Sequence, residues 1–169
     1  IKDKVIVRYN LSVNDLGNKG IVYVNYVSDG IEVYNNTIVT STQTNYIFMT
    51  NSGNQTKCNF FNNLVYNRSA TAKISMHRDY TFSNNLFYSE NGCSIENLDS
   101  IKTINKNGLY VNPELTGPID TVSRTGYDNM YEYTLGQGSP CIGAGLSTDA
   151  LYDYFGNAAN NNIRCASNA

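Results

Sequence analysis

A nine-residue pattern recurs four times in the first half of the chain. The copies are VIVRYNLSV (Val5–Val13), IEVYNNTIV (Ile31–Val39), CNFFNNLVY (Cys58–Tyr66) and YTFSNNLFY (Tyr80–Tyr88). The sixth residue is always asparagine, at Asn10, Asn36, Asn63 and Asn85, with spacings of 26, 27 and 22 residues. Such a period is typical of repeat architectures, in which each unit buries its apolar face against its neighbours.

Each copy is predicted to form two short strands joined by an asparagine corner. The first and third residues lie two apart, so they should share one face of the strand and point toward the interior. Asparagine tolerates left-handed backbone angles, and amides at one corner of successive turns can stack as a ladder. A third short strand is expected before each later copy, at Ile21–Val24, Tyr46–Met49 and Lys73–Met76. Three short strands in a turn of roughly 25 residues predict an all-β parallel β-helix, with coils ~4.8 Å apart.

Several longer segments resemble secreted bacterial β-helix proteins. They are RYNLSVND (Arg8–Asp15), IEVYNNTIV, GLYVNPEL (Gly108–Leu115), YTLGQGSPCIGAG (Tyr133–Gly145) and DYFGN (Asp153–Asn157). Together they resemble the C-terminal portion of right-handed parallel β-helix proteins of the pectate-lyase-like superfamily. The resemblance covers nearly the whole chain and implies an extracellular or cell-surface location. It implies little about activity, because the superfamily includes lyases, hydrolases, adhesins and binding domains.

One domain is expected from 169 residues. About three to four coils should occupy residues 1–108, and an irregular closing segment of the same domain should occupy 109–169 and cover the edge of the last coil. The first copy lacks a preceding strand and the chain begins at Ile1. We therefore expect upstream coils or an upstream domain of the same parent protein, since a β-helix with an open end is prone to aggregation.

Composition argues against two classes of partner. The chain has 12 basic and 14 acidic residues and a net charge of −2, with no basic run, which argues against nucleic-acid binding. No hydrophobic run is long enough to insert into a membrane. Asparagine is abundant, with 26 residues, and its recurrence at the predicted corners gives part of this abundance a structural explanation.

Four cysteines permit disulfides in a secreted chain. The favoured pair is Cys141–Cys165, because both lie in the closing segment. A Cys58–Cys93 pair is the alternative, and Cys58 fits equally well as a small buried apolar residue. No spacing matches a zinc motif.

No complete catalytic constellation is visible. His77, Arg78 and Asp79 are consecutive and could supply a base and a cation that stabilises charge on a uronate, or could form a polar turn. Lys73 is a weak candidate for a lyase base. The eight acids of residues 1–100 occupy scattered repeat positions, so neither the calcium-dependent lyase pattern nor the clustered aspartates of hydrolases is matched.

No cofactor is expected, although calcium binding stays open. Asp149 and Asp153 could coordinate calcium with nearby carbonyl oxygens, or Asp153 could cap a turn.

Aromatic residues at outward repeat positions favour a binding function. The predicted outward set comprises Arg8, Tyr34, Phe61 and Ser83 at the fourth position and Tyr23, Tyr46 and Phe48 on the preceding strand. The periodicity does not orient Tyr66 and Tyr88 at the ninth position, because the seventh position is apolar as well. Aromatic faces flanked by amides and cations suit an elongated sugar polymer, such as a cell-wall or uronate-containing glycan. Alternatively, the aromatics pack under loops or between coils.

We therefore expect an extracellular module that binds or positions a polysaccharide. Two alternatives stay open: the C-terminal part of a polysaccharide lyase or glycoside hydrolase with its catalytic coils upstream, and a structural stalk or adhesin segment.

Overall fold

The strands of the chain stack into three parallel sheets. A computed structural model describes residues 5–16, 18–25, 30–51, 57–77, 79–117 and 132–148. The first sheet contains β1 (Val5–Arg8), β4 (Ile31–Tyr34), β7 (Cys58–Phe61), β10 (Tyr80–Ser83) and β13 (Asn105–Lys106). The second contains β2 (Leu11–Val13), β5 (Thr37–Val39), β8 (Leu64–Asn67) and β11 (Leu86–Ser89). The third contains β3 (Val22–Val24), β6 (Tyr46–Thr50), β9 (Ala72–Ser75) and β12 (Ile95–Glu96).

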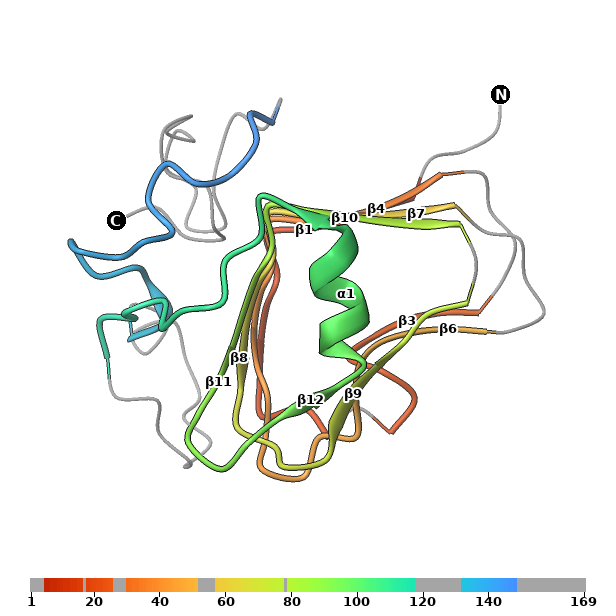
Figure 1. The fold of residues 1–169 in the computed structure, drawn as a ribbon, viewed down its shortest axis with the longest axis horizontal. Helices are drawn as coiled ribbons and strands as arrows, with labels where there is room; N and C mark the ends of the chain where they lie inside the picture. Colours follow the sequence, from red (N-terminus) through yellow and green to blue (C-terminus); the bar gives the residue numbers. More distant parts are fainter. Residues whose placement is uncertain are drawn as a thin grey trace.

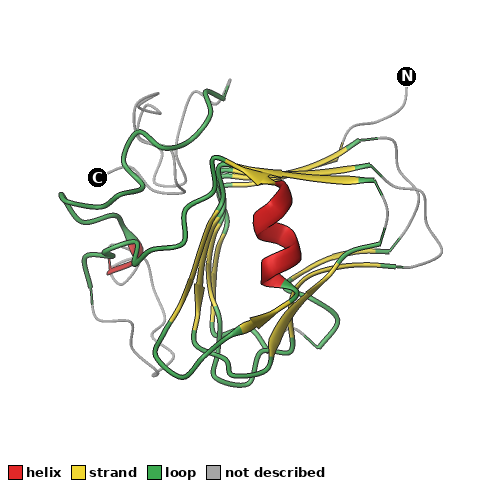
Figure 2. Cartoon of the chain, in the orientation of Figure 1, coloured by secondary structure: helices red, strands yellow, loops and turns green. Residues whose placement is uncertain are grey.

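The prediction of a parallel β-helix is confirmed. Every coil contributes one strand to each sheet, all pairings between named strands are parallel, and about four turns are completed. Viewed along the stack, the three sheets enclose a three-sided interior (Figures 1 and 2). Successive copies of the nine-residue pattern pair in register, so Val7, Val33, Phe60 and Phe82 form one inward row.

The corner between the first and second sheets explains the repeated Asn-Asn pair. The fifth residue of the pattern has a left-handed backbone, with φ of 52° at Asn35, 55° at Asn62 and 52° at Asn84. Asparagine adopts this conformation at lower cost than most residues. The sixth residue then points inward, where Asn36, Asn63 and Asn85 are buried.

The inward asparagines form the predicted ladder. Each Nδ2 donates to the Oδ1 of the asparagine one coil further on, at 2.9 Å from Asn10 to Asn36, 2.9 Å from Asn36 to Asn63 and 2.9 Å from Asn63 to Asn85. The backbone N–H of each donor residue reaches the same Oδ1, at 3.0 to 3.3 Å. The second Nδ2 proton binds a backbone carbonyl, such as that of Val33 for Asn63. The ladder therefore pairs polar groups that would otherwise be buried without partners.

A different arrangement ends the ladder. Asn85 donates to Oδ1 of Asn105 at 3.1 Å, although Asn105 occupies the third position of its coil and pairs in register with Phe82. The sixth position is Gly108, where an added Cβ would lie 2.0 Å from Nδ2 of Asn105. Asn105 thus fills the space of the next asparagine, and only glycine fits at the sixth position.

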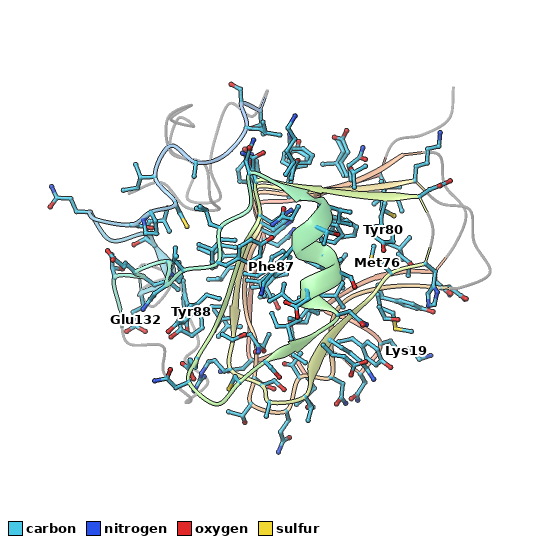
Figure 3. All side chains as sticks on the ribbon, in the orientation of Figure 1. Lys19, Met76, Tyr80, Phe87, Tyr88 and Glu132 are labelled. Atoms are coloured by element: carbon cyan, nitrogen blue, oxygen red, sulfur yellow. The ribbon has the colours of Figure 1, made fainter. Side chains whose placement is uncertain are left out.

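Stacked phenylalanines occupy the interior. The rings of Phe60 and Phe82 are parallel within 9° with centroids 4.9 Å apart, and Phe48 packs against Phe60 at 4.9 Å. Phe87 of the second sheet, labelled in Figure 3, packs against Phe48 and Phe82. Aromatic pairs of this kind contribute about 0.5–1.5 kcal/mol each beyond the area they bury.

Helix α1 (Leu98–Ile104) covers the C-terminal end of this interior (Figure 1). Its buried Ile101 belongs to the same apolar cluster as Phe60 and Phe82. Helix α1 shares the covering of this end with Tyr110, which packs against the same cluster, so the described closure begins at Leu98, before the expected start at about residue 109. Among the described residues from 109 onward, Leu109 continues the second sheet through a bridge to Leu86.

Residues 109–117 and 132–148 lie instead against the outer face of the second sheet (Figure 1). Seventh- and ninth-position residues of the pattern point outward there and are covered by Leu115, Tyr133, Leu135 and Cys141. The outward residues are Leu11, Val13, Val39, Leu64, Tyr66, Leu86 and Tyr88. Tyr66 and Tyr88 are thus oriented outward but pack under the C-terminal segment.

The fifth-position asparagines anchor the same segment. Asn84 donates to the carbonyl of Ala144 at 2.9 Å, and Asn35 donates to Oγ1 of Thr148 at 3.4 Å. Between them, Asn62 makes two bonds with Leu146: Nδ2 donates to the carbonyl at 2.9 Å, and Oδ1 accepts the backbone N–H at 2.7 Å. One column of asparagines therefore stabilises the interior, and the adjacent column fixes the C-terminal segment.

The structure decides one of the two predicted disulfide pairs. Cys58 and Cys93 are both free thiols, so the Cys58–Cys93 pair is not formed, and Cys58 is a buried core residue. Cys141 is buried beside the second sheet, whereas Cys165 lies outside the described residues. The Cys141–Cys165 disulfide therefore stays a prediction.

Burial of Cys58 predicts a pH-dependent stability. Cys58 is 1% exposed, and burial raises the pKa of its thiol from 9.0 to about 11. The unfolded chain therefore loses this proton at lower pH than the folded chain, so the free energy of unfolding should fall as pH rises from 9 to 11. Urea denaturation at several pH values measures it, with Cys58→Ala as the control that loses this component. An equal pH dependence in that variant would contradict the assignment.

Candidate carbohydrate-binding surface

The fourth position of the pattern forms a column on the outer face of the first sheet. Arg8 pairs in register with Tyr34, and Tyr34 pairs with Phe61. The column continues through Ser83 and ends at Lys106. The prediction that Arg8, Tyr34 and Phe61 align across coils is confirmed. Lys106 was missed, because β13 follows a helix and lacks the nine-residue pattern.

Arg8, Tyr34 and Phe61 form a continuous stack. Nη1 of Arg8 donates to the hydroxyl of Tyr34 at 2.8 Å, and its guanidinium lies 5.8 Å from the centre of the Tyr34 ring. The rings of Tyr34 and Phe61 are parallel within 10° with centroids 4.5 Å apart. Because in-register strands place the rings side by side along the stack, each ring turns a face toward the neighbouring coil.

The members of this stack differ in exposure. Tyr34 is only 5% exposed, so most of its ring is covered and it cannot present an open face to a ligand. Arg8 is exposed and Phe61 is half-buried. The next residue in register after Phe61 is the small Ser83, so the aromatic stack ends at Phe61. The face of Phe61 that is turned toward Ser83 is the part of the stack best placed to receive another ring.

Polar residues accompany the stack at the second position of the pattern. Glu32 and Asn59 are half-buried and Thr81 is exposed, and Oγ1 of Thr81 donates to Oδ1 of Asn59 at 2.8 Å. Lys106 is exposed beyond Ser83. The outer face of the first sheet thus combines an aromatic stack, hydrogen-bonding groups and cations at both ends of the column.

The third sheet agrees only in part with the predicted outward set. Tyr23 and Tyr46 are half-buried, but Phe48 is 0% exposed and lies in the core, so its outward assignment is wrong. The pairing of β6 with β9 shifts register between Tyr46 and Met49. An irregularity of this kind interrupts the alternation of side chains, and Ile47 and Phe48 are both buried.

Lys73 is poorly suited to act as a base. Its ammonium lies 4.5 Å from the centre of the Tyr46 ring. Hydrogen bonding and charge interaction with Tyr46 raise the pKa of Lys73 above its usual value. A lysine that accepts a proton near neutral pH needs a lowered pKa, which is the opposite direction.

His77 and Asp79 are exposed on the turn between the third and first sheets, and Arg78 lies outside the described residues. The backbone N–H of His77 donates to Oγ1 of Thr50 at 2.7 Å. His77 also lines an open cavity of about 290 Å³ with Met76, Tyr80 and Ser100, beside α1. Figure 3 shows Met76 and Tyr80 close together beside α1. Asp79 does not line the cavity, so the described residues do not join His77 and Asp79 in one site.

A second polar site was not expected from the sequence. Tyr66, Glu90 and Glu114 line an open pocket of about 300 Å³ between the second sheet and the C-terminal segment. Nε of the buried Arg68 lies 3.4 Å from Oε1 of Glu90. Burial, followed by the charge of Glu90, raises the pKa of Tyr66 to about 12. Arg68 and Glu90 directly follow β8 and β11, and Glu114 lies in the C-terminal segment, so the sequence gives no sign that these residues meet.

No group of three or more His, Cys, Asp or Glu side chains suited to a metal ion occurs in the part of the chain that is described. Asp149 and Asp153 lie outside that part, so the calcium site stays a prediction. Among the described helices, none has the length and apolar character needed to cross a membrane.

Comparison with protein-family models, with curated proteins and with solved structures finds no match for this chain. The pectate-lyase-like relationship therefore stays an expectation from the sequence.

Proposed function

We propose that the protein binds an elongated polysaccharide along the outer face of the first sheet. The observation that carries the proposal is the end of the aromatic stack at Phe61, with the small Ser83 next in register. A sugar ring could continue the stack over Ser83, where its apolar face would lie against the Phe61 ring.

The surroundings of Phe61 favour a polymer over a single sugar. The column runs parallel to the stack axis from Arg8 to Lys106 and is accompanied by Asn59 and Thr81. Hydrogen-bonding groups arranged along this line could contact several sugar units. The exposed cations at its two ends favour a glycan that contains uronates, because carboxylates attract guanidinium and ammonium groups.

The chain would act as an extracellular or cell-surface module that holds its glycan without cleaving it. A pectate-lyase-like origin and secretion are consistent with this role. Polysaccharide is the proposed partner, and no resident cofactor is required for stacking. Calcium would contribute only if a uronate polymer were bridged by the ion.

Affinity gel electrophoresis tests the proposal. Migration is compared in gels containing neutral or uronate-rich polysaccharide, with and without calcium. We expect selective retardation by the uronate-rich polymer. Phe61→Ala should weaken binding about tenfold, the equivalent of about 1.4 kcal/mol, because one ring-stacking contact is removed. Lys106→Ala should weaken binding less and mainly at low ionic strength.

Tyr23→Ala is the matched control: Tyr23 belongs to the aromatic set predicted from the sequence, but it is a half-buried aromatic on the third sheet, away from the first-sheet face where the proposal places the glycan. It should leave retardation unchanged. Binding that Phe61→Ala leaves intact would place the ligand elsewhere. Absence of retardation on every polymer would refute glycan binding by this chain and leave the structural stalk as the better account.

A further inference from the structure

Residues 144–148 lie along the fifth-position asparagines in the manner of a bound peptide (Figure 1). Every second residue of the segment contacts the amide of a different coil, and this is the period of an extended chain. The contacting pairs are Ala144 with Asn84, Leu146 with Asn62 and Thr148 with Asn35. The segment therefore crosses three successive coils at the corner between the first and second sheets.

The amides bind main-chain groups of this segment. Asn62 pairs with Leu146 at both of its polar atoms, since Nδ2 donates to the carbonyl at 2.9 Å and Oδ1 accepts the N–H at 2.7 Å. Asn84 donates to the carbonyl of Ala144 at 2.9 Å. Leu146 itself is 43% exposed, and no residue of 144–148 belongs to a described apolar cluster. Recognition of this kind depends little on the side chains of the bound segment.

The spacing of the coils limits how many contacts the segment makes. Two residues of extended chain span about 6.6 Å, whereas successive coils lie about 4.8 Å apart. A segment centred on Asn62 therefore falls out of register at the coils on either side. No described residue donates to the buried Oδ1 of Asn35 or of Asn84. The segment is held mainly at Asn62, so it can detach without unfolding of the coils.

The coils form this column independently of the segment. The left-handed backbone of Asn35, Asn62 and Asn84 recurs at Asn107, with φ of 55°, one coil further on. Asn107 is exposed, and the segment turns away before it, where the N–H of Ala144 donates to the carbonyl of Cys141. The column is thus longer than the segment that occupies it.

We propose that the fifth-position asparagines form a peptide-binding site, which residues 144–148 of a second copy can occupy in place of the chain's own segment. A second copy presents the same main-chain groups and the same Thr148 hydroxyl, so each contact is reproduced. Exchange of an identical element between copies costs little, because equal contacts replace those that are lost. The site lies at the corner beside the proposed glycan surface and requires no bound glycan.

Two full-length variants test the proposal by complementing one another. Asn62→Gly removes the central amide, and glycine tolerates the φ of 55° at this position. Leu146→Pro removes the N–H that Asn62 accepts and leaves the column intact. Each variant alone should sediment as a monomer. An equimolar mixture at the same total concentration should form a heterodimer, because one copy supplies the column and the other supplies the segment.

Nuclear magnetic resonance of the Leu146→Pro variant locates the contact. The side-chain amide signal of Asn62 should shift when the unlabelled Asn62→Gly variant is added, and also when a synthetic peptide of residues 142–148 is added. The same peptide carrying Leu146→Pro should bind about tenfold more weakly, because it lacks one hydrogen-bond donor.

The wild-type chain supplies a measurement that needs no variant. Amide hydrogen exchange at Leu146 should be at least about tenfold faster than at β8, because detachment of the segment leaves the coils folded. Equal rates at the two places would contradict detachment and overturn the proposal.

Three other results would also overturn it. The first is a mixture that stays monomeric although exchange shows that β7 and β8 are protected in both variants. The second is dimerisation of either variant alone to the same extent, which would place the interface elsewhere. The third is equal binding of the two peptides, which would exclude recognition through the N–H of Leu146.

Discussion

Asn63→Ala is expected to lower the free energy of unfolding by about 4 kcal/mol. Asn63 is 0% exposed, and its Nδ2 donates to Oδ1 of Asn85 and to the carbonyl of Val33, both at 2.9 Å. Its Oδ1 accepts from the backbone N–H and from Nδ2 of Asn36. Removing the amide leaves these partners buried without hydrogen bonds, at about 1–3 kcal/mol for each group that finds no other partner.

Urea denaturation followed by circular dichroism measures this loss. Asn10→Ala is the matched control, because Asn10 occupies the same repeat position at the exposed start of the ladder. Water can replace its partners there, so its loss should cost less than about 1 kcal/mol. Equal losses at the two positions would show that the inner ladder contributes no more than a surface amide.

Gly108→Ala is expected to destabilise the chain by about 3 kcal/mol. An added Cβ would lie 2.0 Å from Nδ2 and 2.7 Å from Cγ of Asn105, and 2.8 Å from the hydroxyl of Tyr110. Asn105 cannot move aside cheaply, because it accepts from Asn85 and donates to Tyr110. Overpacking a well-ordered site typically costs about 1–3 kcal/mol, and here the last rung of the ladder is lost as well.

Combining Gly108→Ala with Asn105→Ala shows how much of the loss comes from overlap between the new Cβ and the Asn105 side chain. Asn105→Ala removes the clashing amide, so Gly108→Ala should cost less in the Asn105→Ala background than in the wild-type chain. Gly92→Ala is the control, since Gly92 has φ of 80° but nothing within 4 Å of an added Cβ. It should cost about 1 kcal/mol from backbone strain alone. Additive losses at Asn105 and Gly108 would argue against direct overlap.

The candidate surface was only partly predictable. In-register copies of one pattern place Arg8, Tyr34 and Phe61 in a line, and this alignment follows from the repeat alone. The exposure of each ring does not follow, because it depends on neighbours that the pattern does not specify. The Tyr34 ring is buried by its neighbours. Phe48 points inward because the pairing of β6 with β9 shifts register, and no Gly, Pro or Asn in β6 indicates this shift in the sequence.

The sequence by itself determined the coil. The spacing of Asn10, Asn36, Asn63 and Asn85 and the alternation around them specify three short strands per turn and an inward ladder, since strand periodicity and corner chemistry are local properties. Only the tertiary structure decided how the stack ends and what lies against it. Closure by α1, Asn105 and Gly108, and anchoring of residues 144–148 by Asn35, Asn62 and Asn84, depend on contacts between segments distant in sequence. The asparagines at the fifth position recur in the pattern, but α1 and residues 144–148, which they or the core contact, lie outside it, so the repeat does not predict these contacts.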